Sequence, residues 1–314
     1  MGLTVGVDVG GTKVLAGVVD YDGFVLAQAR ADTPRTNPDD IAQVIASLVA
    51  QLRDSYPIEA VGVGAAGFID LQRANVLFAA NLIWRDEPLS ERVAKLIDVP
   101  VVVENDGNCH AWAEVRFGAG RGHRSVVAVI LGTGIGGGIV VAGQVFRGGY
   151  GIAGEFGHMR VVPGGHLCGC GRHGCWEQYA SGSALVRCAR EMARVTPASV
   201  PALIALAAGD LEAINGPLVT AAAQAGDAGA VECLATAGEW LGNGLADLAA
   251  VLDPDCFIIG GGVAEAGALL LEPARVAFAA ALTGAAYRPH PPIVAAQLGS
   301  SAGLVGAGDL ARLR

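Results

Sequence analysis

Three cysteines and a histidine fall within the eight residues CGCGRHGC, which run from Cys168 to Cys175. Cys168 and Cys170 are too close in sequence for a comfortable mutual disulfide, and pairing either one with Cys175 leaves a thiol over. Three thiolates and one imidazole make the tetrahedral donor set that structural zinc prefers. We therefore predict a metal site rather than a disulfide, a redox centre or a chance cluster. The candidates for the fourth ligand are the nearby histidines, His158, His166 and His173.

A glycine turn near the N-terminus carries a second set of residues that could do chemistry. In GVDVGGTK, Asp8 ends an apolar stretch, and the turn after it consists of Gly10, Gly11, Thr12 and Lys13. Glycine lets backbone N–H groups approach a phosphate closely, while Thr12 and Lys13 add a hydroxyl donor and a positive charge. The same residues would also suit an ordinary hairpin turn, and the motif alone leaves both interpretations open.

A second glycine turn, LGTGIGGGI, places Thr133 and Gly134 after another apolar stretch. This segment and GVGAAG both match the dinucleotide pattern GxGxxG, which needs a helix to receive the pyrophosphate. A strand pattern follows the first match and the non-helical FIDLQRAN follows the second. We therefore reject a dinucleotide site at both positions.

The stretch VPVVVENDGN delivers Glu104, Asn105 and Asp106 from a buried apolar strand into a loop. A carboxylate near phosphate-binding turns can accept a hydroxyl proton while that oxygen attacks phosphorus. Alternatively, Asn105 or Asp106 caps the helix that begins near Gly107. The spacing leaves both roles open.

The elements that must position these residues form two units of one design. The stretches LTVGVDV, VLAGVVD and FVLAQAR alternate with turns, and a helix then begins at Pro38 after the N-cap Asn37. A strand (AVGVGAAG), a helix around Leu89 to Ile97 and the strand VPVVVEND follow. Later, SVVAVILGTGIGGGIVVAGQVF repeats the strand, glycine turn and strand, and CFIIGGGVAEAGALLL reads as strand, glycine turn and helix. This repetition predicts a duplicated α/β fold.

The composition argues against several classes of protein. The chain has 314 residues, a formal net charge of -9, 52% hydrophobic and 16% charged residues, which gives no electrostatic reason to bind nucleic acid or an anionic membrane. The uncharged stretch from Ser125 to Phe146 contains too many glycines for a membrane helix. The N-terminus lacks the pattern of a signal peptide, and seven unevenly spaced cysteines do not suggest a disulfide framework. We therefore expect a cytoplasmic protein.

Taken together, these motifs resemble those of the ROK (repressor, open reading frame, kinase) sugar kinases, most nearly the bacterial glucokinases. The resemblance covers essentially the whole chain, and its most specific element is GHMRVVPGGHLCGCGRHGCWE. It implies an α/β, two-lobed actin/hexokinase-like (ribonuclease H-like) duplicated fold with an active-site cleft between the lobes. Residues 1–117, completed by a C-terminal helix over 300–314, would form the small lobe, and residues 118–299 the large lobe with the zinc motif.

The resemblance also implies roles for individual residues. The reaction would be ATP-dependent phosphorylation of glucose to glucose 6-phosphate with Mg²⁺, and Asp106 would deprotonate the sugar 6-hydroxyl. The other sugar-binding residues would be Gly67, Asn81, Asn105, Glu155, His158 and Glu177. The ATP-binding residues would be Asp8, Gly10, Gly11, Thr12, Lys13, Thr133, Gly134, Gly261 and Gly262. The Zn²⁺ ligands would be His158, Cys168, Cys170 and Cys175, whereas His166 and His173 fall on no matching position.

Several alternatives stay within or near this family. N-acetylmannosamine or N-acetylglucosamine kinase and fructokinase are rival activities, and polyphosphate is a rival donor that usually brings a basic track. A non-catalytic sugar-binding protein would not need both phosphate turns and Asp106. The family's repressors carry an additional DNA-binding segment before the kinase fold, so we expect no nucleic-acid partner. Relatives are commonly dimers or tetramers, and we expect a homo-oligomer.

Overall fold

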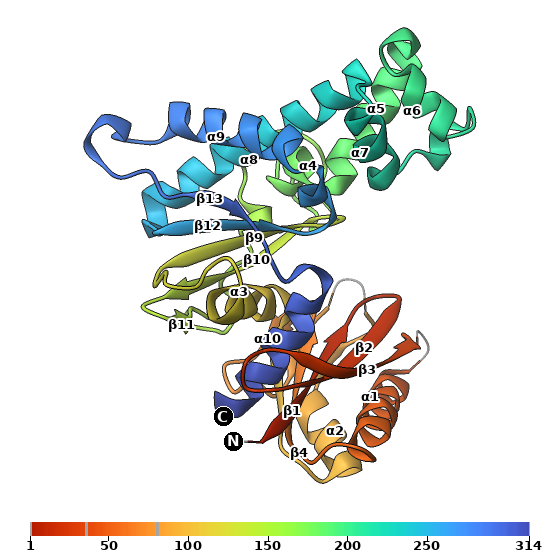
Figure 1. Cartoon of the computed structure of the whole chain (residues 1–314), viewed down its shortest axis with the longest axis vertical. Helices are drawn as coiled ribbons and strands as arrows, with labels where there is room; N and C mark the ends of the chain where they lie inside the picture. The colour runs from red at the N-terminus through yellow and green to blue at the C-terminus, as the bar shows by residue number, and fades with distance from the viewer. Residues whose placement is uncertain (1, 35–36, 80–81, 314) are drawn as a thin grey trace. The chain divides into compact units, whose positions relative to one another are not determined.

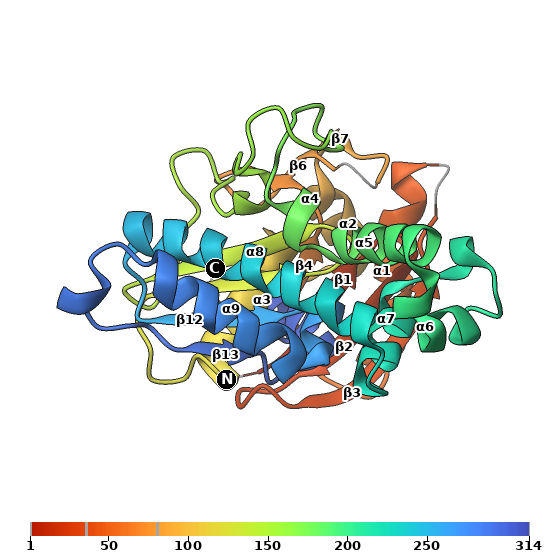
Figure 2. The ribbon, with the colours of Figure 1, turned by 90° about the horizontal axis from the view of Figure 1, so that it is seen from above.

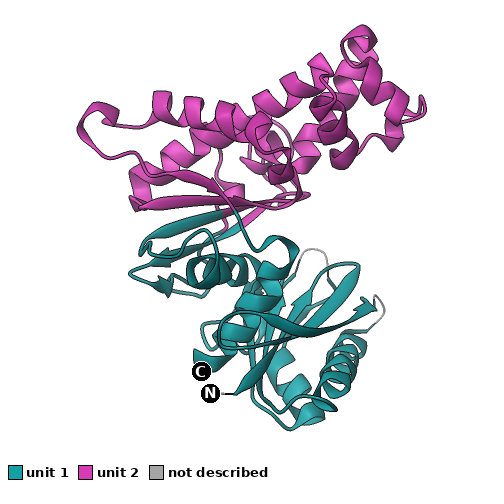
Figure 3. Ribbon diagram, viewed as in Figure 1, with its two compact units in different colours: residues 1–128, 137–154, 296–314 teal, residues 129–136, 155–295 magenta. Residues whose placement is uncertain are grey.

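The computed structural model describes residues 2–34, 37–79 and 82–313 (Figure 1). The chain forms two compact units (Figure 3). Residues 1–128, 137–154 and 296–314 make up the first, and residues 129–136 and 155–295 the second. Among the described residues, no helix is both long enough and apolar enough to span a membrane.

The first unit contains a five-stranded sheet with the order β3-β2-β1-β4-β8. The strands β1, β2 and β3 form an antiparallel meander, while β4 and β8 run parallel to β1. This arrangement matches the predicted alternation of strands and turns. The strand bounds are Leu3–Val9 for β1, Lys13–Val19 for β2, Val25–Asp32 for β3, Ile58–Ala65 for β4 and Val101–Asn105 for β8.

Helices pack on the strands of the first unit. Helix α1 (Pro38–Arg53) begins where predicted, because the Asn37 side chain accepts a hydrogen bond from the Asp39 N–H at 3.0 Å. Its buried stripe of Ile, Leu and Val residues joins the valines of β1 and β4 in one apolar core. Helix α2 (Leu89–Ile97) also has its predicted bounds.

Helices α3 (Asp106–Phe117) and α10 (Ala302–Leu310) lie against each other in the first unit (Figure 1). Helix α10 approaches the sheet so closely that a Cβ on Gly62 would stand 1.8 Å from the Ala307 carbonyl oxygen. Only glycine permits this contact. A small antiparallel sheet, β5-β6-β7, completes the unit with strands Phe68–Ile69, Val76–Phe78 and Arg85–Glu87.

The second five-stranded sheet has the order β11-β10-β9-β12-β13 and therefore repeats the plan of the first. The uncharged stretch from Ser125 to Phe146 is built of strands on either side of a glycine turn, as predicted, and the repeated order confirms the duplication. The strand bounds are Val126–Leu131 for β9, Ile135–Val141 for β10, Gln144–Val145 for β11, Cys256–Gly260 for β12 and Ile293–Ala295 for β13.

Helices α8 and α9 run side by side over strands of the second unit (Figures 1 and 2). The helix bounds are Glu177–Ala180 for α4, Gly182–Val195 for α5, Pro201–Leu206 for α6, Gly216–Gln224 for α7, Ala228–Leu252 for α8 and Ala268–Ala281 for α9. Short 3-10 turns are η1 Phe156–His158, η2 Pro197–Ser199, η3 Leu211–Ala213, η4 Gly262–Ala266, η5 Ala285–Tyr287, η6 Gly299–Ser301 and η7 Ala311–Leu313.

Candidate active site

The first glycine turn is a tight hairpin connection between β1 and β2. The Gly10 N–H donates to the Lys13 carbonyl oxygen at 3.0 Å. Thr33, the residue after β3, holds the turn, because its hydroxyl donates to the Gly10 carbonyl at 2.7 Å and its N–H donates to the Thr12 carbonyl at 3.0 Å. The side chains of Thr12 and Lys13 are exposed. The turn is thus a hairpin, and it also presents the groups that a phosphate needs.

Asp8 lies at the end of β1, beside His110 of α3. A Cβ on Gly303 would stand 2.9 Å from His110 Cε1 and 3.4 Å from Asp8 Cγ, so both side chains reach the same spot on α10. Burial raises the pKa of Asp8, the positive charges of His110 and Lys13 oppose that rise, and the negative charge of Asp106 adds to it. Asp8 and Asp106 therefore share one electrostatic environment.

Asp106 is the first residue of α3, where β8 ends. Asn105 caps the helix, since its Oδ1 accepts from the Asn108 N–H at 3.0 Å. Its Nδ2 donates to the Gly67 carbonyl at 3.1 Å and to Asp106 Oδ1 at 3.2 Å. The capping alternative therefore holds for Asn105, and the same amide also orients the Asp106 carboxylate. His110, to which the sequence assigned no role, contacts the Asp106 carbonyl through Nδ1 at 2.9 Å.

Glu104, the residue before Asn105 in β8, fixes the end of this strand through hydrogen bonds and ion pairs. Sequence reasoning missed this role. The carboxylate is 2% exposed. It accepts from the Asn105 N–H at 2.9 Å and from Asn108 Nδ2 at 3.0 Å. It also pairs with Arg147 Nε at 3.0 Å and with Arg73 Nε at 3.3 Å. A buried acid next to Asn105 and Asp106 was the available signal, but neither arginine is near it in sequence.

The second glycine turn is held by the N-terminus of α5. The Gly132 N–H donates to the Gly134 carbonyl at 3.0 Å. The Gly182 N–H donates to the Gly132 carbonyl at 2.8 Å, and the Ser183 N–H donates to the Thr133 carbonyl at 3.3 Å. Thr133 itself is exposed. Two N–H groups at the start of α5 thereby fix the turn.

A cavity of about 1060 Å³ opens beside this turn within the second unit. Residues of the turn, of α5 and of α7 line it, together with Gly262 of η4. Gly261 lies just before, with φ of 86°, and a Cβ there would stand 2.5 Å from the Leu131 carbonyl oxygen. The volume is at the upper end of that of small-molecule sites, which suits a nucleotide.

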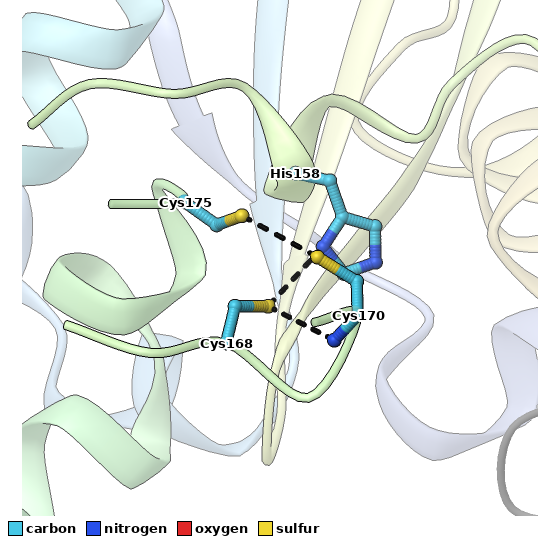
Figure 4. Close-up of side chains that lie close together, drawn as sticks. All are labelled: His158, Cys168, Cys170 and Cys175. Carbon is cyan, nitrogen blue, oxygen red and sulfur yellow. Dashed lines mark hydrogen bonds between the residues drawn. The ribbon is translucent and has the colours of Figure 1, made fainter. Parts of the chain in front are cut away.

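The Cys/His cluster of the second unit brings together the four ligands that the family resemblance implied (Figure 4). A hairpin positions Cys168, because its N–H donates to the Arg172 carbonyl at 2.8 Å. Gly171 and Gly174 have φ of 82° and 79°, and these glycines turn the chain so that Cys175 returns beside Cys168. His158 comes from η1.

The donor atoms of this cluster fit a tetrahedral zinc. One donor atom from each of His158, Cys168, Cys170 and Cys175 lies within 4.8 Å of the others. The Sγ atoms of Cys170 and Cys175 are 3.6 Å apart, and Cys168 Sγ is 3.6 Å from His158 Nδ1. Tetrahedral zinc with ordinary bond lengths places sulfurs about 3.8 Å apart and sulfur and nitrogen about 3.6 Å apart. The residues present therefore fit the ion, and they would hold it through Nδ1 of the histidine.

Glu177 connects the cluster to the second glycine turn. Its Oε1 accepts from the Cys168 thiol at 2.9 Å, and its Oε2 accepts from the Ile135 N–H at 3.4 Å. A Cβ on Gly134 would stand 2.4 Å from the same Oε2. Glu155 lies on the other side of the histidine, with its Oε2 4.0 Å from His158 Nε2. The two glutamates therefore flank His158.

The other histidines lie elsewhere, as the motif pattern indicated. His173 Nδ1 contacts the Gly165 carbonyl at 3.0 Å, and the His166 ring packs on Tyr179 with centroids 5.4 Å apart. Of the predicted site residues, Asp8, Asn105 and Asp106 belong to the first unit, and the Cys/His cluster with both glutamates belongs to the second. Asn81 lies outside the described residues.

The profile of the ROK family matches residues 4–314. The glucokinase of Streptomyces coelicolor is 51% identical over 312 residues, which is 99% of this chain and 98% of that protein. The glucokinase of Thermotoga maritima is 35% identical over 312 residues, 99% of this chain and 97% of that one. A crystal structure of a ROK family glucokinase from Streptomyces griseus in complex with glucose and AMPPNP has 51% identity and a TM-score of 0.91, with 100% of both chains covered.

Proposed function

The chain belongs to the ROK family, and we propose that it transfers the γ-phosphoryl group of ATP to the 6-hydroxyl of glucose. The observation that carries this proposal is the match in sequence and fold, over the whole chain, to a glucokinase crystallised with glucose and AMPPNP. The fold is the two-lobed, actin/hexokinase-like duplicated α/β fold that the motifs indicated. The products are glucose 6-phosphate and ADP.

Asp106 is the proposed general base. A kinase of this type needs positioning, electrostatic stabilisation and one proton acceptor rather than a covalent nucleophile. The Asp106 carboxylate receives the 6-hydroxyl proton while the hydroxyl oxygen attacks the γ-phosphorus and ADP leaves. The amide nitrogen of Asn105 lies 3.2 Å from Asp106 Oδ1 and keeps that carboxylate oriented. Asn105 is also proposed to form a hydrogen bond with a sugar hydroxyl. Asp8 and Lys13, whose charges act on each other, are proposed nucleotide-binding residues of the first unit.

The second unit supplies the remaining proposed contacts. Glu155, His158 and Glu177 are hydrogen-bonding groups for sugar hydroxyls, which a neutral sugar offers in place of charge. Thr133 and Gly134 bind some of the ATP phosphates, and Gly261 and Gly262 lie near the adenosine. Mg²⁺ bound with the nucleotide would neutralise charge on the phosphates. Bound Zn²⁺ would fix the His158 ring by Nδ1, so that Nε2 remains for the substrate.

Further parts of this proposal concern organisation. Residues 1–117 with 300–314 form the small lobe, residues 118–299 the large lobe, and Asn81 and Gly67 contribute to sugar binding. The enzyme is a homo-oligomer of two or four chains and works in the cytoplasm. Chemical cross-linking and analytical sedimentation measure the number of chains in the oligomer directly.

A coupled assay tests the reaction. The full chain is assayed with glucose, mannose, fructose, N-acetylmannosamine and N-acetylglucosamine, each with ATP or polyphosphate as donor. We expect the highest kcat/KM for glucose with ATP. A higher kcat/KM for an N-acetylhexosamine or for fructose would replace glucose as the substrate, and a higher value with polyphosphate would replace ATP as the donor.

A further inference from the structure

Two cysteines that do not belong to the Cys/His cluster lie close together between two helices of the second unit. Cys188 of α5 and Cys233 of α8 place their Sγ atoms 2.7 Å apart. Other sulfur contacts in this unit are longer: Cys170 and Cys175 are 3.6 Å apart, and Cys233 Sγ is 3.6 Å from Met192 Sδ. A disulfide bond measures about 2.05 Å. The pair is therefore closer than ordinary sulfur contacts, and its sulfurs need to approach by less than about 1 Å to bond.

We propose that Cys188 and Cys233 are a redox-active dithiol, which a peroxide converts into a disulfide between α5 and α8 and which a dithiol reductant restores. The zinc chemistry does not involve these residues, since neither is among the four that form the Cys/His cluster. The phosphoryl transfer proposed above does not use them either. The dithiol is thus a modification site separate from both.

The surroundings indicate which sulfur reacts first. Cys188 is half-buried and lines a hollow of about 340 Å³, together with Tyr179 and Trp240. Cys233 is buried. The hydrogen bond from Cys233 lowers the pKa of Cys188 and outweighs burial and the charge of Glu232, which raise it, while the charge of Arg187 lowers it slightly further. An accessible sulfur with greater thiolate character is the one that a peroxide oxidises first.

The steps balance with hydrogen peroxide as the oxidant. The Cys188 thiolate attacks one peroxide oxygen, the O–O bond breaks, and the other oxygen leaves as hydroxide, which takes up a proton to give water. Cys188 is then a sulfenic acid. The Cys233 sulfur attacks the Cys188 sulfur, an S–S bond forms, the S–O bond breaks, and the departing oxygen leaves as a second water with the Cys233 proton. Two thiols have lost two electrons, and the peroxide has gained them.

The disulfide would act on the wall of the large cavity. Helix α5 contributes Arg187, Arg190 and Arg194 to that wall, and its first N–H groups hold the second glycine turn. Because the two sulfurs need to move so little, the bond would fix α5 in its observed place against α8 instead of displacing it. A cross-link between distant positions also restricts the unfolded chain. We therefore expect oxidation to raise the thermal midpoint of the second unit.

Peptide mapping tests the proposal. The zinc-loaded full chain is treated with hydrogen peroxide, its free thiols are blocked with N-ethylmaleimide, and the digest is analysed by mass spectrometry. We expect a linked peptide pair containing Cys188 and Cys233, lighter by two hydrogens than the sum of its parts and absent after dithiothreitol. Unchanged alkylation of both cysteines after peroxide treatment, or links confined to Cys168, Cys170 and Cys175, would overturn the proposal.

Variants assign the order of reaction. In Cys233→Ser, the sulfenic acid at Cys188 should persist and react with dimedone, whereas Cys188→Ser should lose both the adduct and the peroxide-dependent rise in midpoint. Cys256→Ser, which changes a buried cysteine of β12, is the matched control and should retain the linked pair. Dimedone labelling of Cys233 in Cys188→Ser, without labelling of Cys188 in Cys233→Ser, would contradict the assigned order. The wild-type mapping does not depend on how well any variant folds, nor on which sugar the enzyme phosphorylates.

Discussion

Glu104→Gln isolates the buried charge beneath the proposed base. The substitution keeps the side-chain length and one oxygen acceptor, but it removes the negative charge that Arg147 and Arg73 face at 3.0 and 3.3 Å. Breaking a buried ion pair by removing one partner costs about 3–5 kcal/mol. Both arginine side chains keep some contact with solvent, 13% and 19% exposed, so we take the lower end, about 3 kcal/mol. At about 2–4 °C per kcal/mol for a unit of this size, the thermal midpoint should fall by about 6–12 °C.

The same substitution should lower turnover, because Glu104 accepts the Asn105 N–H at 2.9 Å and so fixes the residue that orients Asp106. We expect kcat to fall on the order of tenfold, with a smaller change in the KM for glucose, since misplacing a catalytic group weakens the chemical step more than binding. Thermal unfolding followed by circular dichroism and the coupled assay measure the two effects. Glu104→Asp, which restores the charge one methylene short, should recover part of both.

Glu91→Gln is the matched control for that experiment. Glu91 is exposed and pairs with Lys95 one helical turn away, so its loss should leave the midpoint and kcat unchanged. The reasoning about Glu104 fails if Glu104→Gln unfolds at the wild-type midpoint, or if the control falls by as much.

Three further substitutions address other parts of the molecule. Cys175→Ser should bind no stoichiometric zinc when the metal content is determined by atomic absorption. Its KM for glucose should rise, since the ion would fix the ring of His158. Normal glucose affinity in a folded, zinc-free variant would show that the Cys/His cluster does not shape the sugar site. Burial raises the pKa of Asp8 from its ordinary 3.8. At pH values above the raised pKa, the ionised carboxylate therefore lowers the free energy of unfolding, and this penalty disappears as the pH falls through the raised pKa. Asp8→Asn should therefore raise the midpoint near neutral pH, and thermal unfolding between about pH 4 and pH 7 should show the gain shrinking as pH falls; a gain that grows on acidification would refute the sign. Gly261→Ala should destabilise the second unit by about 1–3 kcal/mol in denaturant unfolding, because φ is positive and the methyl meets the Leu131 carbonyl, whereas Gly262→Ala meets open space and should not; equal effects would contradict the steric account.

Local patterns in the sequence predicted much of the fold. The N-cap Asn37 and the apolar spacing after it gave the correct start of α1, and α2 lies where the pattern placed a helix, around Leu89 to Ile97. Strand, glycine turn and strand recur in the two five-stranded sheets. These signals succeed because capping and periodicity depend on residues close together in the chain.

The motifs of the sequence identified the residues of the Cys/His cluster, but not all of their roles. The residues alone left three histidines open, and the family resemblance selected His158, which is the one that lies with the three cysteines. Spacing also left open whether Asn105 is a cap or a site residue. The structure shows that one side chain can cap α3 with its oxygen and hold Asp106 with its nitrogen.

Contacts between distant segments were beyond the sequence. Nothing near Glu104 in the sequence indicates that Arg73 and Arg147 converge on it, because the turn between β5 and β6 and the loop after β11 bring the two arginines to it. The link from Glu177 to Ile135 and the approach of Cys188 to Cys233 likewise depend on how α4, α5 and α8 pack. Periodicity predicts that such helices exist, but it does not predict which polar atoms meet.

The kinetics of Asp106→Ala and Asp106→Asn, measured beside glucose binding by calorimetry, test the central claim most directly. General-base catalysis contributes about 10²–10⁴-fold, so we predict that kcat falls by that factor in both variants while the dissociation constant for glucose changes little. Wild-type turnover in either folded variant would contradict the account and remove Asp106 from the proton transfer.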